Sequence, residues 1–371
     1  APMRIGVDLR LAYHQMAGIS WYAIRLLTAL SKIDRENTYV LLQHRRQKDP
    51  LIQAPNFAHT TLLAPVHHRL EQRILSLETT FLNLDLIHSP DFIPPLHNAI
   101  PAVITVHDLA FLLYPNFVTA ESARYYGQVE EAVKRASRII AVSHSTKNDL
   151  IEILGAPERK IDVIYEAADP AFQPIPHSIA RQRLAATGID APDTFILFVG
   201  TIEPRKNLGI LLRAYQLLRS RYGMQTPLLL SGSMGWLSED IRELVGRLGL
   251  EKHVRFLGRT STEQLLYLYN LATLLAHPAH YEGFGLTPLE AMACATPVVC
   301  SDAGSLPEVV GDAALLAPPD DEEAWAIALH RVLEDPNLQQ SLSEQGLARA
   351  RQFSWEKAAR QTLETYRKAV L

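Results

Sequence analysis

The chain of 371 residues carries 36 lysines and arginines, 40 aspartates and glutamates, and only 2 cysteines. At roughly 150 residues per domain, this length predicts two or three domains. The near balance of charge excludes a basic nucleic-acid binder, and the cysteine count excludes a disulfide-stapled scaffold. Because the sequence shows neither an apolar run long enough to span a membrane nor a secretory signal pattern, we expect a cytoplasmic protein.

Short apolar runs alternate with amphipathic stretches through the first half of the chain. The predicted strands are Met3–Leu9, Tyr39–Gln43, Leu86–His88, Ala102–Val106, Arg138–Val142 and Ile161–Ile164. Apolar residues at helical spacing predict helices at about Ser20–Leu30, 68–82, 121–136 and 145–153. This alternation is typical of a parallel sheet covered by helices on both faces.

Three prolines, Pro170, Pro174 and Pro176, form the best candidate for a linker between two domains. The alternation then restarts, with strands predicted at Phe195–Val199, Pro227–Leu230, Val254–Leu257, Leu274–His277, Pro297–Cys300 and Ala314–Ala317. The sequence therefore predicts two doubly wound α/β domains, 1–175 and 176–354. A last helix, 355–371, is predicted to cross back to the first domain.

A glycine-containing loop follows the predicted strand at Leu274–His277 and leads into a helix. Thr287, Pro288 and Glu290 fit the N-cap, N1 and N3 positions of a capping box. The free amides at such a helix start suit a phosphate group. Taken alone, however, this pattern favours Glu290 as a capping residue and Glu282 as a solvated loop acid.

A second loop, Val199–Leu208, also runs from a strand into a helix, with Asn207 as the predicted N-cap. It places Arg205 and Lys206 side by side at a strand end, where ligands bind in doubly wound sheets. Two adjacent cations there would hold phosphate oxygens, although a solvated pair is the usual alternative. The two loops together favour an anion-binding site.

These loops resemble the C-terminal domain of the retaining glycosyltransferases of family 4, the glycosyl transferases group 1. The family signature is a pair of acidic residues eight apart around Gly-Phe-Gly, matched by Glu282 and Glu290, and a basic loop matched by Pro204–Asn207. Matches at His107-Asp108 and at Gly258, with weaker ones at Gly18 and Ser143, extend the resemblance over nearly the whole chain. It implies a GT-B architecture of two Rossmann-like domains facing across a cleft. The first would bind the acceptor and the second the nucleotide sugar.

The resemblance also implies a role for each matched residue. His107, beside the anomeric centre, and Glu282 would be catalytic. The sugar would be bound by Glu282, Gly283, Phe284 and Gly285. The donor phosphates would be held by Gly18, Arg205, Lys206, Gly285, Leu286 and Thr287. The nucleoside would be bound by Gly258, Arg259, Thr260, Leu265 and Glu290. Thr201 stands where many relatives carry an arginine, so the diphosphate charge would rest on Arg205 and Lys206.

The expected reaction is the transfer of a hexose from a nucleotide sugar, with UDP-glucose and GDP-mannose as leading donors, to a hydroxyl of a carbohydrate or lipid-linked acceptor. The resemblance implies retention at the anomeric carbon and a place in polysaccharide biosynthesis. Since the sequence has no Asp-x-Asp motif, we expect no metal and no other cofactor. The alternatives are a GT-B epimerase or phosphorylase, or a silent module that binds nucleotide sugars. A dehydrogenase is excluded because no Gly-x-Gly-x-x-Gly follows the first strand.

Three weaker signals have ordinary structural interpretations that we favour. His277 and His280 have zinc-like spacing, but Pro278 prevents one helical face from presenting both. Ser143-His144 lacks the strained turn of a nucleophile. The stretch 66–84 mixes basic and apolar residues and fits either a solvated helix or a peripheral contact with the inner face of a membrane.

Overall fold

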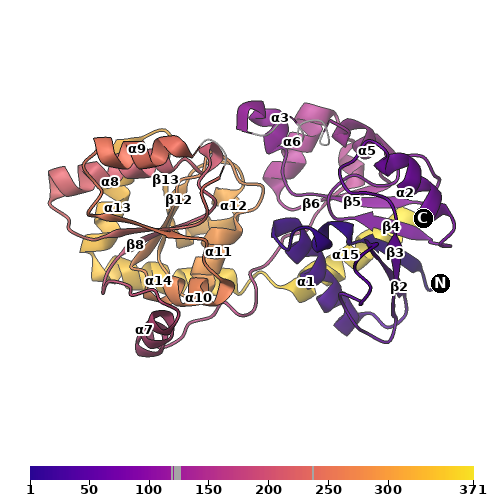
Figure 1. The fold of residues 1–371 in the computed structure, drawn as a ribbon, viewed down its shortest axis with the longest axis horizontal. Coiled ribbons are helices and arrows are strands. Elements are labelled where there is room, and N and C mark those ends of the chain that lie inside the picture. Colours follow the sequence, from indigo (N-terminus) through magenta and orange to yellow (C-terminus); the bar gives the residue numbers. More distant parts are fainter. Residues whose placement is uncertain (118–119, 121–126, 236–237) are drawn as a thin grey trace. The chain divides into compact units, whose positions relative to one another are not determined.

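The computed structural model describes residues 1–117, 120, 127–235 and 238–371, and the chain divides into two compact units (Figure 1). Unit 1 comprises Ala1–Glu166 and Ser354–Leu371, and unit 2 comprises Ala167–Phe353. The division therefore falls between Glu166 and Ala167, before the proline-rich stretch, whereas the sequence placed it within that stretch, between residues 175 and 176. That stretch belongs to unit 2, where the amide of Ile175 donates to Oδ1 of Asn270 at 2.8 Å.

The described part of unit 1 contains a seven-stranded parallel sheet in the order β3-β2-β1-β4-β5-β6-β7. Its strands are β1 (Arg4–Asp8), β2 (Thr38–His44), β3 (Phe57–Leu62), β4 (Leu86–Ser89), β5 (Ala102–Val106), β6 (Arg138–Ala141) and β7 (Ile161–Val163). The central strands are buried on both faces, which explains their continuous apolar sequences. The edge strand β3 was missed because it carries exposed residues such as His59 and lacks such a run.

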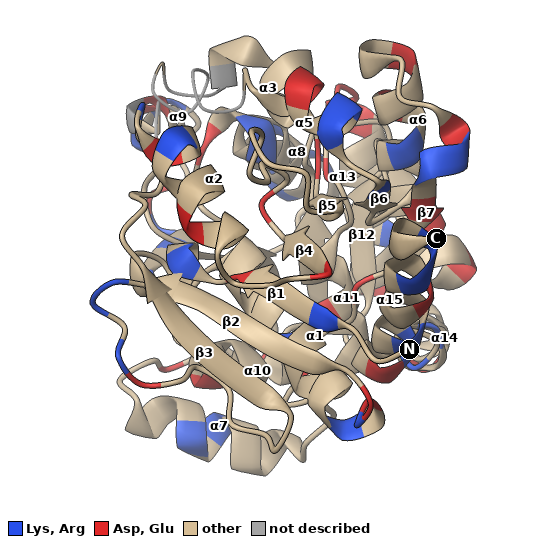
Figure 2. Cartoon of the chain, turned by 90° about the vertical axis from the view of Figure 1, so that its right-hand side faces the viewer, with Lys and Arg blue, Asp and Glu red and all other residues tan. Residues whose placement is uncertain are grey.

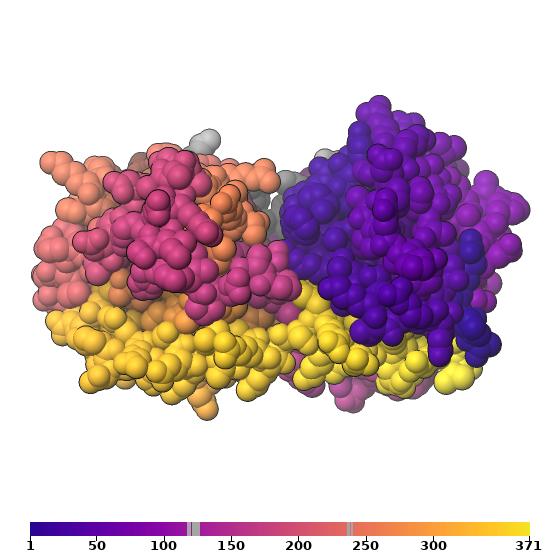
Figure 3. All heavy atoms as spheres, turned by 90° about the horizontal axis from the view of Figure 1, so that it is seen from below, coloured from indigo at the N-terminus to yellow at the C-terminus, as the bar shows by residue number. Residues whose placement is uncertain are grey.

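Helices cover both faces of this sheet. They are α1 (Gly18–Ile33), α2 (Glu71–Thr80), α3 (Ala110–Leu113), α5 (Val129–Arg135), α6 (His144–Leu154) and α15 (Trp355–Val370), with 3-10 turns at Arg10–Tyr13, Pro115–Phe117 and Glu158–Lys160. The predicted helix 121–136 is described only from residue 127 onward, and α1 begins at Gly18 instead of Ser20. The C-terminal helix α15 belongs to unit 1, where Figure 3 shows the last residues (yellow) against the N-terminal ones (indigo).

Unit 2 has a six-stranded parallel sheet, within its described residues, in the order β10-β9-β8-β11-β12-β13. Its strands are β8 (Ile196–Val199), β9 (Leu228–Ser231), β10 (Val254–Gly258), β11 (Leu274–His277), β12 (Val298–Ser301) and β13 (Leu315–Ala317). Its helices are α7 (His177–Ala186), α8 (Leu208–Tyr222), α9 (Glu239–Arg247), α10 (Thr262–Leu271), α11 (Leu286–Ala293), α12 (Leu306–Val310), α13 (Glu322–Glu334) and α14 (Pro336–Ala350), with 3-10 turns at Pro204–Lys206 and Gly311–Ala313. The prediction of two doubly wound parallel-sheet domains is thus confirmed.

The strand order of each sheet changes direction at one place, between β1 and β4 in unit 1 and between β8 and β11 in unit 2. In sheets of this kind ligands bind beyond the carboxyl ends of the strands at such switch points. On the face of unit 1 that Figure 2 shows, lysines and arginines are interspersed with acidic residues, so the distribution of charge does not mark a site there. The sites must therefore be found from individual side chains.

Candidate functional site

Glu282 lies at the centre of a charged cluster at the switch point of unit 2. It follows β11, while Arg205 and Lys206 follow the neighbouring β8. Nζ of Lys206 lies 2.6 Å from Oε1 of Glu282, and Nη1 of Arg205 lies 3.4 Å from its Oε2. His277, the last residue of β11, places Nε2 3.1 Å from Oε1. The structure therefore brings together both predicted cations and the first acid of the predicted pair.

The protonation states of this cluster follow from burial and charge. Burial alone would raise the pKa of the Glu282 carboxyl, but Lys206, the hydrogen bond from His277 and Arg205 hold it well below its usual range. Burial lowers the pKa of His277. The hydrogen bond and charge of Glu282 oppose this by raising it, whereas the charges of Lys206 and Arg205 lower it further. His277 is therefore neutral at pH 7 and donates from Nε2 to an ionised Glu282.

Asn207 joins the two loops that carry this cluster. It occupies the predicted N-cap position of α8 in a left-handed conformation, φ 58°, but its side chain makes no capping bond. Instead, Nδ2 donates to the carbonyl of Pro278 at 2.9 Å and to that of Pro319 at 2.6 Å. The amide of His280 donates to the carbonyl of Arg205 at 3.0 Å. These bonds fix the cations relative to the loop of Glu282.

The predicted capping box before α11 is wrong. The helix begins at Leu286, and Gly285, with φ 111°, occupies the N-cap position without a side-chain capping bond. Thr287 and Glu290 therefore lie inside the helix, because the left-handed glycine turns the chain into it two residues early. This removes capping as the explanation for Glu290, which is half-buried and lies 3.5 Å from the hydroxyl of Tyr269.

Two residues that support the Glu282 loop were missed by the sequence reasoning. Oγ of Ser305 lies 2.7 Å from the carbonyl oxygen of Glu282 and 2.6 Å from that of Phe284. Gly304, with φ 57°, packs so closely that a Cβ there would lie 2.9 Å from the Glu282 carbonyl oxygen. The signal that could have found them is the Gly-Ser-Leu-Pro sequence, which begins after two intervening residues beyond the end of β12.

Replacing Gly304 with alanine is expected to lower transfer about tenfold, because the added Cβ must displace the backbone of Glu282 by tenths of an ångström. The left-handed backbone adds a stability loss of about 1–2 kcal/mol. Gly249→Ala is a matched control, since Gly249 has φ 66° and a Cβ there meets no atom within 4 Å. Steady-state kinetics and thermal melts of both variants check this, and equal activity in the two would contradict it.

The residues predicted to bind the nucleoside lie around β10 and α10. Gly258 ends β10, Arg259 and Thr260 follow it, and Leu265 lies on α10, the helix that also carries Tyr269. Oγ1 of Thr260 is 2.6 Å from Oγ of Ser231, at the end of β9. Through Tyr269, α10 reaches Glu290, whereas no described contact links Gly258 or Arg259 directly to Glu282.

In unit 1, His107 follows β5 and has both ring nitrogens next to acceptors. Nδ1 lies 3.1 Å from Oε1 of Glu166, and Nε2 lies 2.9 Å from the carbonyl oxygen of Pro90. Burial lowers the pKa of His107, but the hydrogen bond and charge of Glu166 and the bond to Pro90 raise it overall. Because an ionised carboxylate and a carbonyl can only accept, both contacts are hydrogen bonds when both ring nitrogens carry protons, and the site therefore favours the imidazolium form of His107. Asp108 instead accepts the amide of Ala110 at 2.9 Å.

A buried chain of hydrogen bonds connects the C-terminal helix with the surroundings of His107. The hydroxyl of Tyr366 lies 2.6 Å from Nδ1 of His88, and Nε2 of His88 lies 2.7 Å from Oγ1 of Thr105. The hydroxyl of Tyr22 lies 3.1 Å from the same Oγ1, and its ring packs edge-on against His107. Burial and the charge of His107 lower the pKa of His88 to about 3, so this ring is neutral.

The ion pair of His107 with Glu166 predicts a pH-dependent contribution to stability. A raised pKa in the folded state means that the pair stabilises fully below the ordinary histidine value of 6.5 and loses this effect as pH rises through the folded-state pKa. Glu166→Gln is therefore expected to cost about 1 kcal/mol near pH 6 and almost nothing near pH 9. Urea unfolding at several pH values measures this, with the exposed Glu152→Gln as control. A cost that grows with pH would contradict the assignment.

Two further predicted residues, Gly18 and Ser143, lie at the starts of helices. Gly18 is the first residue of α1, and a Cβ there would meet no protein atom within 4 Å, so neither its backbone nor its packing requires glycine. Oγ of Ser143 accepts a hydrogen bond from the amide of Thr146 and caps α6.

Across the described ranges, no three His, Cys, Asp or Glu side chains are grouped so as to hold a metal ion, and no helix is long and apolar enough to cross a membrane. Cys294 and Cys300 are buried free thiols.

Comparison with known proteins identifies the family. The description "Glycosyl transferases group 1" matches residues 181–349, and "Glycosyltransferase Family 4" matches residues 16–172. The O-antigen chain mannosyltransferase B of Escherichia coli is 38% identical over 290 residues, which are 76% of this chain and 74% of that protein. The D-inositol 3-phosphate glycosyltransferase of Kineococcus radiotolerans is 32% identical over 292 residues, 73% of this chain and 67% of that one.

Solved structures show the same fold. Sucrose-phosphate synthase from Thermosynechococcus elongatus matches with a TM-score of 0.80 and 24% identity over 99% of this chain and 98% of that one. HepE from Anabaena, in complex with UDP and glucose, matches with a TM-score of 0.74 and 23% identity over 98% and 99% of the two chains. Both likenesses bear on the GT-B fold alone. From the sequence matches, this chain is a glycosyltransferase and belongs to family 4, the glycosyl transferases group 1.

Proposed function

We propose that this glycosyltransferase moves a hexose from a nucleotide sugar to a hydroxyl of a carbohydrate or lipid-linked acceptor, with retention and without a metal ion. The observation that carries the proposal is the cluster of Arg205, Lys206 and Glu282 at the switch point of unit 2. Two fixed cations there suit a leaving diphosphate, on which negative charge develops as the glycosidic bond breaks. They would do the work that a divalent ion does in other transferases.

The cluster also explains how a donor would be accommodated. Both cations are held by Glu282, which is ionised, and Arg205 also contacts Glu203 at 3.2 Å. A diphosphate would compete with these carboxylates for the cations and release Glu282 to accept a hydroxyl of the donor sugar. The amides of Gly283 to Thr287 and the half-buried Glu290 would then bind the phosphates and the ribose. In unit 1, the Gly18 amide and the His107 imidazolium are the corresponding candidates.

GDP-mannose and UDP-glucose are the donors to test first. The relative from Escherichia coli is named a mannosyltransferase, whereas HepE was solved with UDP and glucose. The name of the first relative also supports a place in polysaccharide biosynthesis for this chain.

Thermal-shift measurements with a panel of nucleotide sugars would identify the donor. A ligand present at a concentration of 100 times its Kd stabilises the folded protein by about 2.7 kcal/mol. Transfer to a panel of oligosaccharides, followed by NMR of the anomeric proton, would test retention, and the same assay with EDTA would test metal independence. Inverted product, an isomerised sugar nucleotide, or activity abolished by EDTA would each contradict the corresponding part of the proposal.

A further inference from the structure

The imidazole ring of His107 lies between two groups that can only accept hydrogen bonds. Nδ1 is 3.1 Å from Oε1 of Glu166, and Nε2 is 2.9 Å from the carbonyl oxygen of Pro90. Because an imidazole has only these two nitrogens, the two contacts use its whole capacity for hydrogen bonds. No nitrogen is left to take a proton from a substrate hydroxyl or to give one to a leaving group.

Packing fixes the position of this ring as well. The side chain of His107 is 17% exposed, and that of Glu166 is 6% exposed. The ring of Tyr22 packs edge-on against His107, with 4.7 Å between the ring centroids, and the Tyr22 hydroxyl lies 3.1 Å from Oγ1 of Thr105. A rotation that freed either nitrogen of His107 would leave a buried oxygen atom without its donor, which is unfavourable.

The charged groups around the ring are carboxylates. Burial lowers the pKa of His107, but Glu166, which follows β7, and Asp91, which follows β4, raise it overall together with the bond to Pro90. Asp108, the next residue in the chain, uses Oδ1 to accept the amide of Ala110.

The other titratable groups on this side of the sheet are uncharged at pH 7. Burial raises the pKa of the two tyrosines, and burial with the charge of His107 lowers the pKa of the histidine to about 3. These groups are Tyr22 on α1, His88 on β4 and, hydrogen-bonded to His88, Tyr366 on α15. His107 is thus a cation whose neighbours are either carboxylates or neutral.

A neutral ring would fit these surroundings poorly. It would carry one proton, so either Glu166 or the carbonyl of Pro90 would face a nitrogen lone pair instead of a donor. An acid–base catalyst changes its protonation state in each cycle, and each change here would lose one of the two hydrogen bonds. The geometry instead keeps one positive charge in one place, which is the arrangement that stabilises an anion developing during a reaction.

We infer that Glu166 is a positioning residue that holds His107 as a fixed cation, and that this cation stabilises the leaving diphosphate without transferring a proton. The second half of the inference rests on the proposed function, whereas the first half concerns unit 1 alone. As the bond from the anomeric carbon to the phosphate oxygen breaks and the bond to the acceptor oxygen forms, the acceptor hydroxyl loses its proton to the departing phosphate. His107 keeps both of its protons throughout.

Glu166→Gln separates the charge at this position from its hydrogen bond. The glutamine amide can donate to Nδ1 while Nε2 still donates to Pro90, so a neutral ring keeps both contacts and only the charge is lost. We expect the titration of His107, followed by NMR of the full chain with labelled histidine, to move to lower pH in this variant. The signal of His107 is assigned by its absence from His107→Gln.

Glu152→Gln is the matched control, because it removes an exposed acid on α6 and should leave the titration of His107 unchanged. A Glu166→Gln protein that titrates like wild type would overturn the first half of the inference. So would a wild-type midpoint below 6.5, the ordinary histidine value, and this second result does not depend on the folding of any variant.

The pH dependence of transfer distinguishes a fixed cation from a general base. A cation is lost as pH rises through the pKa of His107, so kcat/KM for the donor should fall there, whereas a base would gain activity. Glu166→Gln should lower kcat/KM on the order of tenfold at pH 7 and move the fall to lower pH. In the His107→Gln background, Glu166→Gln should have no further effect, because Glu166 acts only through the ring.

Two results would overturn the second half of the inference. One is a wild-type kcat/KM that rises through the titration of His107, and the other is a pH profile that is the same in wild type and Glu166→Gln. Absence of transfer from every nucleotide sugar at every pH would refute the proposed function, and the second half with it. The first half would still be decided by the NMR titration, so the two failures are distinguishable.

Discussion

Lys206→Ala is expected to lower kcat/KM for the donor by about 10²–10³, the loss typical of removing one fixed charge that stabilises a developing anion. Nζ of Lys206 makes the shortest contact with Glu282, at 2.6 Å, and the two side chains are each 13% exposed. The free energy of unfolding should also fall by about 1–3 kcal/mol, because the buried Glu282 carboxylate loses one of its partners. Donor kinetics together with urea unfolding measure both effects.

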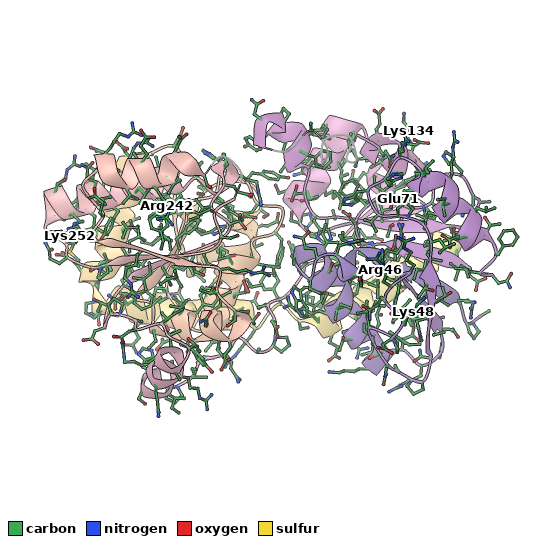
Figure 4. The ribbon with its side chains drawn as sticks, in the orientation of Figure 1. Arg46, Lys48, Glu71, Lys134, Arg242 and Lys252 are labelled. Atoms are coloured by element: carbon green, nitrogen blue, oxygen red, sulfur yellow. The ribbon has the colours of Figure 1, made fainter. Side chains whose placement is uncertain are left out.

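Lys252→Ala serves as the matched control for this variant. Lys252 is exposed at the outer rim of unit 2 (Figure 4), and its removal should change neither transfer nor stability. Lys206→Arg should recover only part of the activity. The positive charge is kept, but a planar guanidinium replaces the compact ammonium group. Wild-type kinetics in Lys206→Ala would remove this residue from the donor site.

Glu282→Gln is expected to change binding and turnover in opposite directions. The substitution keeps the size of the side chain but removes the anion that holds Arg205 and Lys206, so UDP or GDP should bind on the order of tenfold more tightly. Turnover should fall about 10–100-fold, because the charged acceptor for a donor hydroxyl is lost. Calorimetry with the nucleoside diphosphate and kinetics with the donor separate the two effects.

Glu203→Gln is the control for Glu282→Gln. It also removes a carboxylate that pairs with Arg205, but Glu203 is not proposed to contact the sugar. Glu203 pairs with Arg205 at 3.2 Å and is 28% exposed, so its removal should tighten nucleotide binding only slightly and leave turnover almost intact. A Glu282→Gln protein with weaker nucleotide binding would contradict competition between Glu282 and the diphosphate. A variant with unchanged turnover would show that Glu282 does not contact the sugar.

Sequence patterns were enough to predict the class of fold and the two loops of the charged cluster. Buried parallel strands need continuous apolar runs, so β5 and β11 were predicted with the bounds they have. Arg205, Lys206 and Glu282 could be linked because residues at the carboxyl ends of parallel strands share one edge of a sheet. The edge strand β3 lacks such a run, and its pairing with β2 fixes it only in the folded chain.

The groups that surround the functional side chains, in contrast, could be known only from the folded chain. Glu166 and Pro90 accept hydrogen bonds from the two ring nitrogens of His107, yet they lie far from it in sequence, and their neighbours there give no sign of the contact. The capping box failed because the backbone angle of Gly285, which local pattern does not specify, starts the helix early. Likewise, the buried ion pair of Arg10 with Glu71 forms only because α2 and the turn that follows β1 are brought together in the folded chain. Periodicity reports how each segment is buried, whereas hydrogen-bond partners and charge balance depend on which segments meet.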